Sequence, residues 1–339
     1  MVKPNLRSTT ASQSEKTVTH SKSRLITLLR WFDNNAGALP DDRDNRKIDW
    51  LRTIPFIALH TAGLTVFWVG ISPVAVGVAL GLYVIRMFAI TGFYHRYFSH
   101  KAFRTSRPVQ FLFALLGASA VQRGPLWWAS HHRYHHVHSD NSKDVHSPRQ
   151  QGFLWSHMGW FLCQVNFRTR IELVKDWLKF PELRFLDRYD VVVPILLALG
   201  LFGLGELLAY LQPDWGTNGL QMLIWGFVIS TIVLYHSTFA VNSLAHVWGK
   251  RRYATCDDSS NNAFLAMITL GEGWHNNHHH YPASARQGFY WWEFDPTYYV
   301  LRLMATVGLV WDLRPLPAAF RESRRQDVRP DFGQRKLLP

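Results

Sequence analysis

Four apolar stretches of this chain are each close to the length that crosses a bilayer. Two lie in the first third of the sequence and meet at Pro73, and two lie beyond residue 190, separated by "QPDWGTNG". A transmembrane helix needs about 20 predominantly apolar residues. The sequence therefore predicts two hairpins with spans at about 54–72, 74–92, 191–211 and 220–241. Buried helices of a soluble protein are the alternative.

Basic residues are confined to particular segments of the chain. All but one of the 37 Lys and Arg residues lie before Ile54, between Phe93 and Tyr189, or after Val241. The positive-inside rule then places both termini and the central segment of this multi-pass chain in the cytosol. This distribution explains the net charge of +13 without a nucleic-acid partner. The exception, Arg86, is expected to snorkel to the inner face.

The remaining sequence divides into a membrane domain and two tails. Residues 1–45 form a basic N-terminal tail, 46–317 the membrane domain and 318–339 a basic C-terminal tail. Short apolar runs at 109–122, 153–163 and 297–311 are too short to span and indicate interfacial helices. The predicted fold class is an all-α integral membrane protein, with four transmembrane helices and a cytosolic helical cap.

Histidines gather at the cytosolic ends of the predicted spans and in the cytosolic segments. Within "HRYHH" and "HNNHH" they lie at i, i+3 and i+4, so on a helix each set shares a face. Neutral imidazole is a common ligand of transition metals, and nine such groups exceed a single tetrahedral site. The sequence therefore predicts a site for two metal ions. The candidate ligands are His95, His100, His132, His135, His136, His246, His275, His278 and His279, with Asn242 one turn before His246.

Other residues near these clusters are expected to have supporting roles. Soluble di-iron proteins use pairs of Glu-x-x-His motifs, whereas Glu272 begins the sole copy within these clusters and is expected to lie beside the ligands. Trp127 and Trp128 are candidates to line an internal tunnel or to anchor the chain at the interface. Polar packing or hydrogen bonding is expected for the other histidines considered, namely His60, His131, His138, His146, His157, His236 and His280.

These motifs resemble those of integral-membrane fatty-acyl desaturases, in particular the Δ9 acyl-CoA and acyl-lipid enzymes, over roughly 54–317. The resemblance rests on "TGFYHRYFSHKAF", "HRYHH", "DVHSP", "GFLWSHMGW", "NSLAH" and "GEGWHNNHHHYP". It implies that the nine histidines bind two iron ions, with Asn242 reaching a metal through water. It also implies dioxygen as co-substrate and a separate electron donor, either ferredoxin or a b-type cytochrome with its reductase.

The chain departs from the acyl-CoA enzymes just before the second histidine box. In those enzymes an Arg-Asp pair at this place contacts the CoA part of the substrate, whereas this chain has Ser130 and His131. An acyl-CoA, an acyl-lipid and an acyl-carrier protein therefore all stay open as substrate carriers. The function expected from the resemblance is oxygen-dependent desaturation of a saturated acyl chain at Δ9. A related di-iron hydroxylase and a membrane metal-binding or transport protein are the alternatives.

Overall fold

Long apolar helices form the body of the protein. The computed structural model describes residues 29–36 and 47–326, and in that part of the chain three helical segments are long and apolar enough to cross a membrane. They cover Pro73–Ser99, Val192–Leu211 and Gly219–His246. Each begins beside the start of a predicted span. The elements within them are α3 (Pro73–Phe88), η2 (Ala89–Ser99), α8 (Val192–Leu211), α9 (Gly219–Gln221), η8 (Met222–Ile229), α10 (Ser230–Ser243) and η9 (Leu244–His246).

The first predicted span, 54–72, is shorter and displaced toward the N-terminus. Helix α2 covers Trp50–Gly63, the 3₁₀ turn η1 covers Leu64–Phe67, and no helix covers residues 68–72. The displacement has a local cause, because the Asp49 side chain accepts a hydrogen bond from the backbone N–H of Arg52 and caps the helix there.

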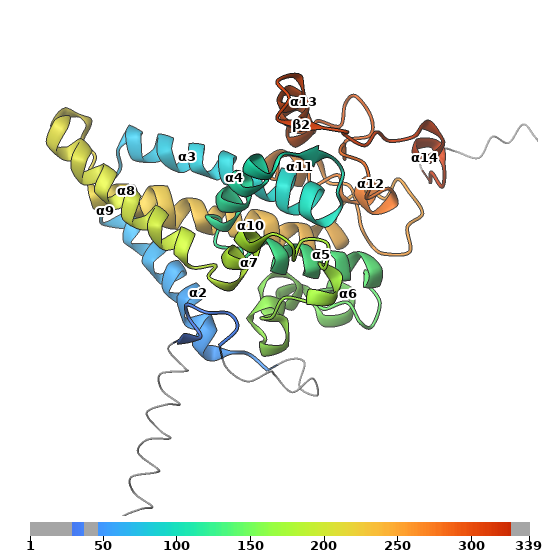
Figure 1. Cartoon of the computed structure of the whole chain (residues 1–339), viewed down its shortest axis with the longest axis horizontal. Coiled ribbons are helices and arrows are strands. Elements are labelled where there is room, and N and C mark those ends of the chain that lie inside the picture. The colour runs from blue at the N-terminus through green and yellow to red at the C-terminus, as the bar shows by residue number, and fades with distance from the viewer. Residues whose placement is uncertain (1–28, 37–46, 327–339) are drawn as a thin grey trace, which may run out of the picture.

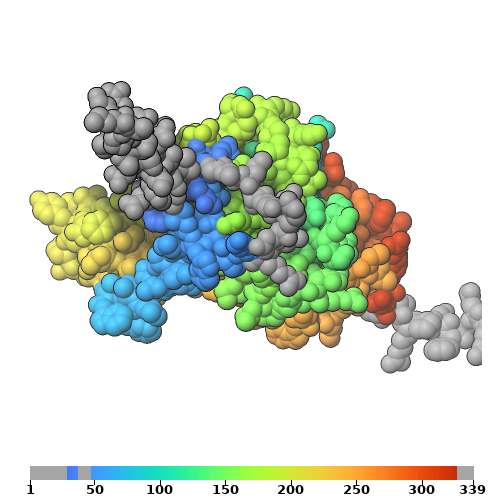
Figure 2. All heavy atoms as spheres, turned by 90° about the horizontal axis from the view of Figure 1, so that it is seen from below, coloured from blue at the N-terminus to red at the C-terminus, as the bar shows by residue number. Residues whose placement is uncertain are grey.

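The two hairpin connections lie together at one end of the bundle. The hydroxyls of Ser72 and Thr217 are 2.5 Å apart, and the Trp225 indole N–H donates to the Gly70 carbonyl at 2.9 Å. In Figure 2 the light-blue connection before α3 and the yellow connection after α8 project side by side. The opposite ends of the helices carry the remainder of the chain, which includes the histidine clusters (Figure 1).

A cap of short helices covers that opposite end. It packs against the bundle through a shared aromatic core that includes Phe93, Tyr94, Phe98 and Trp177. Of the predicted interfacial helices, 109–122 corresponds to α4 and 297–311 to α13, whereas 153–163 forms only the short turns η3 and η4. The cap elements are β1 (Arg104–Thr105), α4 (Arg107–Ala118), α5 (Pro125–His138), α6 (Pro148–Gln151), η3 (Trp155–Gly159), η4 (Trp160–Leu162), η5 (Gln164–Asn166), η6 (Ile171–Leu173), α7 (Pro181–Arg188), α11 (Ala263–Ile268), α12 (His275–His280), α13 (Pro296–Thr306), β2 (Val310–Trp311) and α14 (Ala318–Glu322). The short turn η7 (Pro213–Trp215) lies at the other end, in the connection between α8 and α9.

The predicted tails lie largely outside the described residues. Of the N-terminal tail only 29–36 is described, and of the C-terminal tail 318–326. That C-terminal part forms α14, and Arg325 pairs with Tyr253 in an isolated antiparallel bridge.

Arg86 does not snorkel, so this prediction is wrong. The side chain is fully buried, and its guanidinium donates to the Ser119 carbonyl and to the hydroxyls of Thr231 and Ser230. A charged group inside an apolar bundle needs such partners. The acceptors come from α10 and from the end of α4, so Arg86 ties the cap helix to two long helices.

Three histidines form a hydrogen-bonded chain between helices, as predicted. The His236 ring lies between His60, at 3.2 Å between the Nε2 atoms, and His157, whose Nε2 is 3.0 Å from His236 Nδ1. The chain joins α2 to α10 and η3, and it ends at the Phe56 carbonyl and the Ser243 hydroxyl. The three histidines therefore stabilise the packing of α2 rather than joining the clusters beyond the spans.

A glycine substitution tests the contact between α4 and η2. A Cβ atom on Gly117 would lie 2.1 Å from the Tyr94 ring, which is buried and cannot move aside, whereas a Cβ on Gly77 of α3 would meet nothing within 4 Å. We expect Gly117→Ala to lower the free energy of unfolding by about 1–3 kcal/mol through overpacking. Thermal unfolding of the detergent-solubilised protein measures this, with Gly77→Ala as the control. Equal melting temperatures for the two variants would contradict the close packing of Gly117 against Tyr94.

Candidate metal centre

The first histidine pair is aligned by an unusual helix. Residues Ala89–Ser99 form a π-helix, and the His100 backbone N–H donates to the His95 carbonyl at 3.3 Å, an i to i+5 bond. In an α-helix residues five apart point in different directions, because successive residues turn by about 100°. The π-helical bonding instead brings His95 and His100 to one face, with ring centroids 5.0 Å apart.

The two HxxHH motifs lie on helices α5 and α12, and each divides its histidines between two groups. In α5 the i, i+4 pair His132 and His136 goes to one group and the middle residue, His135, to the other. In α12 the i, i+4 pair His275 and His279 goes to the second group, and the middle residue, His278, goes to the first. The first group is His95, His100, His132, His136 and His278, and the second is His135, His246, His275 and His279.

The nine predicted ligands thus converge as a group of five and a group of four. Within each group the candidate ligand nitrogens lie within 4.8 Å of one another. The groups adjoin, since the rings of His136 and His279 stack at 4.4 Å and the rings of His278 and His279 lie 5.7 Å apart. The prediction that each HxxHH motif shares one face needs refinement, because each motif serves two neighbouring centres.

Four of these rings contact buried carboxylates. In each of them the contact is made by Nδ1, the ring nitrogen that faces away from the other histidines of its group. His246 Nδ1 lies 2.7 Å from Asp140, His279 Nδ1 lies 2.7 Å from Asp257 and His135 Nδ1 lies 3.1 Å from Asp144. Glu272 forms the same kind of contact with His95 Nδ1. A carboxylate at Nδ1 keeps the proton there and leaves the Nε2 lone pair free for a metal.

The opposing Nε2 atoms face each other at distances that suit a shared cation. The Nε2 atoms of His246 and His275 lie 3.0 Å apart, and those of His95 and His278 also lie 3.0 Å apart. In the second group the buried Nε2 of His279 has no hydrogen-bond partner in the described part of the chain. Converging imidazole lone pairs without a proton between them fit a bound metal in each group.

Burial favours the neutral form of several of these imidazoles. At His135 burial is outweighed by the nearby Asp144, which raises the pKa of the ring. Desolvation, reinforced by the neighbouring imidazoles, holds the pKa values of His132, His136 and His278 well below the ordinary histidine value. Among the carboxylates, burial opposes ionisation of Asp144, but His135 and His146 outweigh it and hold the pKa of Asp144 far below its usual range. Neutral rings beside charged carboxylates are the protonation states that metal binding requires.

Two arginines of the histidine motifs brace the cap against the spans. Arg96, fully buried, pairs with Glu272 at 3.1 Å and with Asp295 at 2.9 Å. Arg133 donates to the backbone carbonyls of Phe98 and Ser99 and pairs with Asp176. These contacts fix the end of η2 against α5 and against the segment that carries the third histidine motif.

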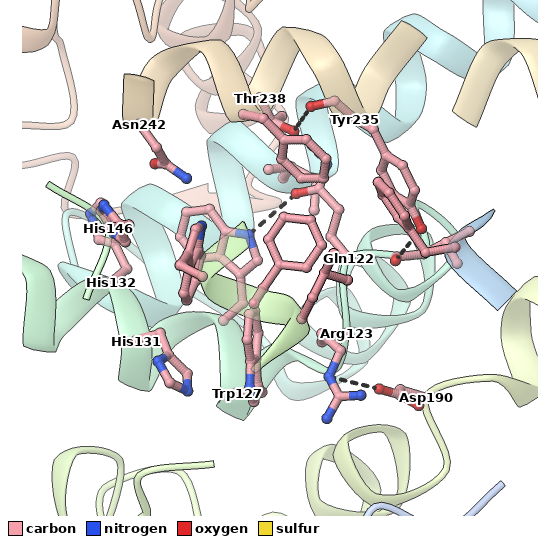
Figure 3. Close-up of a pocket in the computed structure, with 18 of the residues that line it drawn as sticks. Gln122, Arg123, Trp127, His131, His132, His146, Asp190, Tyr235, Thr238 and Asn242 are labelled. Carbon is pink, nitrogen blue, oxygen red and sulfur yellow. Dashed lines mark hydrogen bonds and ion pairs between the residues drawn. The ribbon is translucent and has the colours of Figure 1, made fainter. Parts of the chain in front are cut away.

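A cavity of about 370 Å³ leads to both histidine groups. It is lined by His95 and His132 of the first group and by His135 and His275 of the second. Its walls are mainly aromatic and aliphatic, and they include Trp127 and Trp128. Asn242 lies at the end of α10 with its side chain directed into this space (Figure 3).

Three hydrogen-bonded side chains, Gln122, Thr238 and Trp128, place polar groups in the otherwise mainly apolar wall of the cavity, and we call them the Gln122 belt. Gln122 donates to the Thr238 hydroxyl at 2.7 Å and accepts from the Trp128 indole N–H at 3.4 Å (Figure 3). Trp127 instead uses its indole N–H on the Asn166 carbonyl at 2.7 Å. Both tryptophans therefore have fixed orientations at the cavity wall, and their rings present apolar faces to whatever occupies it.

Comparison with known proteins decides the family. The fatty acid desaturase family model matches residues 42–314. This chain belongs to the fatty acid desaturase family. It is 37% identical to the sn-1 stearoyl-lipid 9-desaturase of Anabaena variabilis over 79% of this chain and 94% of that protein.

Two further relatives of this desaturase differ in the substrates that their names state. The palmitoyl-monogalactosyldiacylglycerol delta-7 desaturase of Arabidopsis thaliana is 39% identical over 74% of this chain, a match that spans 64% of that protein's length. The acyl-CoA C20 Delta5-desaturase of Anemone leveillei is 35% identical over 81% of this chain and 88% of that protein. This chain is thus an enzyme of the fatty-acyl desaturase class.

Most flanking histidines of the desaturase pack as predicted. His131 Nε2 bonds the Arg168 carbonyl, His280 stacks on Tyr253 and bonds the Phe320 carbonyl, and the His138 ring packs at a tilt against Tyr134. His146 stacks on His135 beside Asp144 and forms with them a third cluster of potential metal-binding groups. Glu272, as predicted, lies beside the histidines.

Sequence reasoning missed three of the four carboxylates at this centre. Asp140 and Asp144 lie in "SDNSKD", directly after the second histidine motif, and that proximity was the available signal. Asp257 lies in "CDDSS", which carries no motif. Its partner His279 is 22 positions away in the sequence, so only the fold brings them together.

Neighbouring aspartates provide a matched test of the carboxylate contacts. Asp257 bonds the ring of His279, whereas the side chain of Asp258 is partly exposed and pairs with Arg149 and Arg251. We expect Asp257→Asn to weaken metal binding by about 10–100-fold, because the amide no longer fixes the proton on Nδ1. Elemental analysis after equilibration with limiting ferrous salt measures this. Asp258→Asn should match the wild type, and equal loss in both variants would refute the assigned role of Asp257.

Proposed function

We propose that this enzyme introduces a double bond at the Δ9 position of a saturated fatty-acyl chain. Two hydrogens leave adjacent methylene carbons, and dioxygen takes them up together with two electrons and two protons to give two water molecules. The observation that carries the proposal is the position of two histidine groups at the end of an apolar cavity. An unactivated C–H bond needs an oxidant that side chains do not supply.

The nine histidines would hold two iron ions, five around one and four around the other. Iron bound there supplies the redox chemistry that activates dioxygen. Asn242 lies in the cavity wall one turn before His246, a position suited to contact with a metal through a bound water. The carboxylates of Asp140, Asp144, Asp257 and Glu272 orient the imidazoles and balance part of the added positive charge.

The cavity would position the acyl chain by its shape. A methylene chain offers no hydrogen-bonding group, and each buried methylene contributes about 0.8 kcal/mol to its binding. Trp127 and Trp128 would line this tunnel, as their place in the wall supports. The Gln122 belt, with Thr238 and Trp128, limits how far the chain can shift and so helps to select the carbons that face the histidines.

The proposed topology has four spans, with the histidine cap and both termini in the cytosol. Helix α2 and η1 together rise by roughly 29 Å, close to the thickness of the bilayer's hydrocarbon core. Phe67 and Trp68, at 79% and 78% exposed, suit contact with lipid. The membrane domain is proposed to be that of residues 46–317, and the location to be the inner membrane of a bacterium.

Electrons would come from a separate protein. A ferredoxin or a b-type cytochrome with its reductase fits the predicted cytosolic face, because the chain carries a net charge of +13 and such donors are acidic. The acyl carrier is an acyl-lipid, an acyl-CoA or an acyl-carrier protein.

Product analysis tests the reaction. We expect expression in a desaturase-deficient host to produce fatty acids with a double bond at Δ9, because the histidine groups lie at a fixed depth of the cavity. Gas chromatography with double-bond location measures the product. Hydroxy fatty acid without alkene would identify a hydroxylase, and unchanged lipids with altered metal uptake would identify a metal transporter.

Two histidines of the third motif give a matched test of the site. We expect His275→Ala to abolish alkene formation because its imidazole belongs to the group of four. His280→Ala should retain activity, since that ring stacks on Tyr253 and lies outside both groups. Lipid analysis, with immunoblots of the membrane fraction to show equal insertion, measures the difference. Activity in the His275 variant would contradict its assignment as a ligand.

A further inference from the structure

Three arginines line the cavity, and Arg123 lies on the side away from His132 and His146 (Figure 3). Arg30, Arg52 and Arg123 line the same space as the histidine groups. We call this set the arginine mouth. Arg30 comes from the segment before α2, Arg52 from the first turn of α2 and Arg123 from the connection that precedes α5. An apolar cavity needs no charged residue to hold a hydrocarbon chain, so this cluster requires an explanation.

Two of the guanidinium groups pack on one aromatic ring. The guanidinium carbons of Arg52 and Arg123 each lie 4.8 Å from the centroid of the Phe167 ring. Such packing holds both groups in place through their planar faces. One N–H of Arg123 donates to the Phe167 carbonyl at 2.5 Å, and its other N–H groups remain available to an anion together with those of Arg52. Like charges held this close repel each other unless an anion lies between them.

The acids of the mouth pair with two of its three arginines. Asp49 pairs with Arg30, and Asp190 lies 3.4 Å from the Nε of Arg123 (Figure 3). Within residues 29–36 and 47–326, Arg52 has no ion pair, and its buried Nε has no hydrogen-bond partner. The Nε of Arg123 faces Asp190. Asp33 and Asp187 add further negative charge near Arg52 and Arg123. Arg52 is therefore the arginine of the mouth with which an anion would pair.

The position of the mouth indicates where its anion comes from. Arg52 lies two residues after the start of α2, and Asp190 lies just before α8 begins. In the proposed topology both places are the cytosolic ends of spans, at the depth where a bilayer places the phosphates of its own lipids. A lipid that enters from the bilayer can place its phosphate there without leaving the membrane.

We propose that the arginine mouth binds the phosphate of a glycerophospholipid whose acyl chain occupies the cavity. This inference rests on the proposed function and names the acyl carrier that the sequence leaves open. Arginine matches phosphate because its planar N–H groups can bind two oxygens at once. A neutral galactolipid has no anion for the mouth. An acyl-CoA or acyl-carrier protein carries phosphates, but it approaches from the cytosol rather than from the bilayer.

Ligand binding without turnover tests the proposal. The detergent-solubilised full-length protein is titrated under anaerobic conditions without reductant, and native mass spectrometry counts the bound ligand. The probes are stearoyl-lysophosphatidylglycerol, neutral monostearoylglycerol and stearoyl-CoA, which share one acyl chain. We expect the lysophospholipid to bind about tenfold more tightly than the neutral ester, as charge-assisted hydrogen bonds of this kind allow.

Substitutions assign that preference to the mouth. The double variant Arg52→Gln with Arg123→Gln should bind both stearoyl esters within about twofold of each other, with the affinity for the neutral ester unchanged. Unchanged neutral binding also shows that the cavity is folded. Arg52→Lys, which keeps the charge but not the planar fork, should retain part of the preference. Arg104→Gln, at an exposed residue paired with Asp312, is the control and should match the wild type.

Several outcomes would overturn the proposal. Equal binding of the charged and neutral esters by the wild type would do so, as would a preference that survives in the double variant. Tighter binding of stearoyl-CoA than of the lysophospholipid would assign the mouth to a soluble thioester carrier. Alkene formation is assayed separately, so a preference without desaturation would refute the proposed function and leave the phosphate site standing.

Discussion

The hydrogen bond between a buried carboxylate and the outer nitrogen of an imidazole is the contact on which this centre depends. It occurs at Asp140, Asp144 and Asp257, and Glu272 forms its counterpart at His95. Each contact decides which ring nitrogen carries the proton and which way the other points. Without these contacts, nine histidines in a confined volume would have no preferred tautomer and no common direction. The carboxylates also supply negative charge to a cluster that otherwise consists of imidazoles.

The helices supply the geometry that this contact needs. The spans deliver His95, His100 and His246 to one end of the bundle, and the cap brings two short helices over it. On each of these two helices, the i, i+4 pair of histidines belongs to one of the two groups, and the third histidine belongs to the other group. The two helices contribute their pairs to different groups. Arg96 and Arg133 then fix the cap to the spans, so that side chains remote in the sequence keep their distances. In the proposed function, the cavity between α2, α5 and α10 would complete the site by directing an apolar chain toward both groups.

Much of this arrangement could be predicted from the sequence. Apolar length located three long helices, and histidine spacing located all nine members of the two groups. These signals are local, because a transmembrane span or an HxxHH motif consists of consecutive residues of a single helix. The division into five and four could not be read in this way. It depends on a π-helix between Ala89 and Ser99, which no simple spacing rule reveals, and on how α5 and α12 face each other. The partners of Arg86 and Asp257 likewise come from distant segments, which explains why Arg86 was assigned to the membrane surface and Asp257 was not identified.

The central claim is that two separate sets of imidazoles hold two metal ions in one chain. X-ray absorption at the iron edge, combined with elemental analysis of the purified iron-loaded protein, tests it most directly. Two iron ions per chain, each with the multiple-scattering signal of several imidazole ligands, are the expected result. A single iron ion per chain, or two ions coordinated mainly by carboxylate oxygen without that signal, would contradict the assignment of the five-histidine and four-histidine groups.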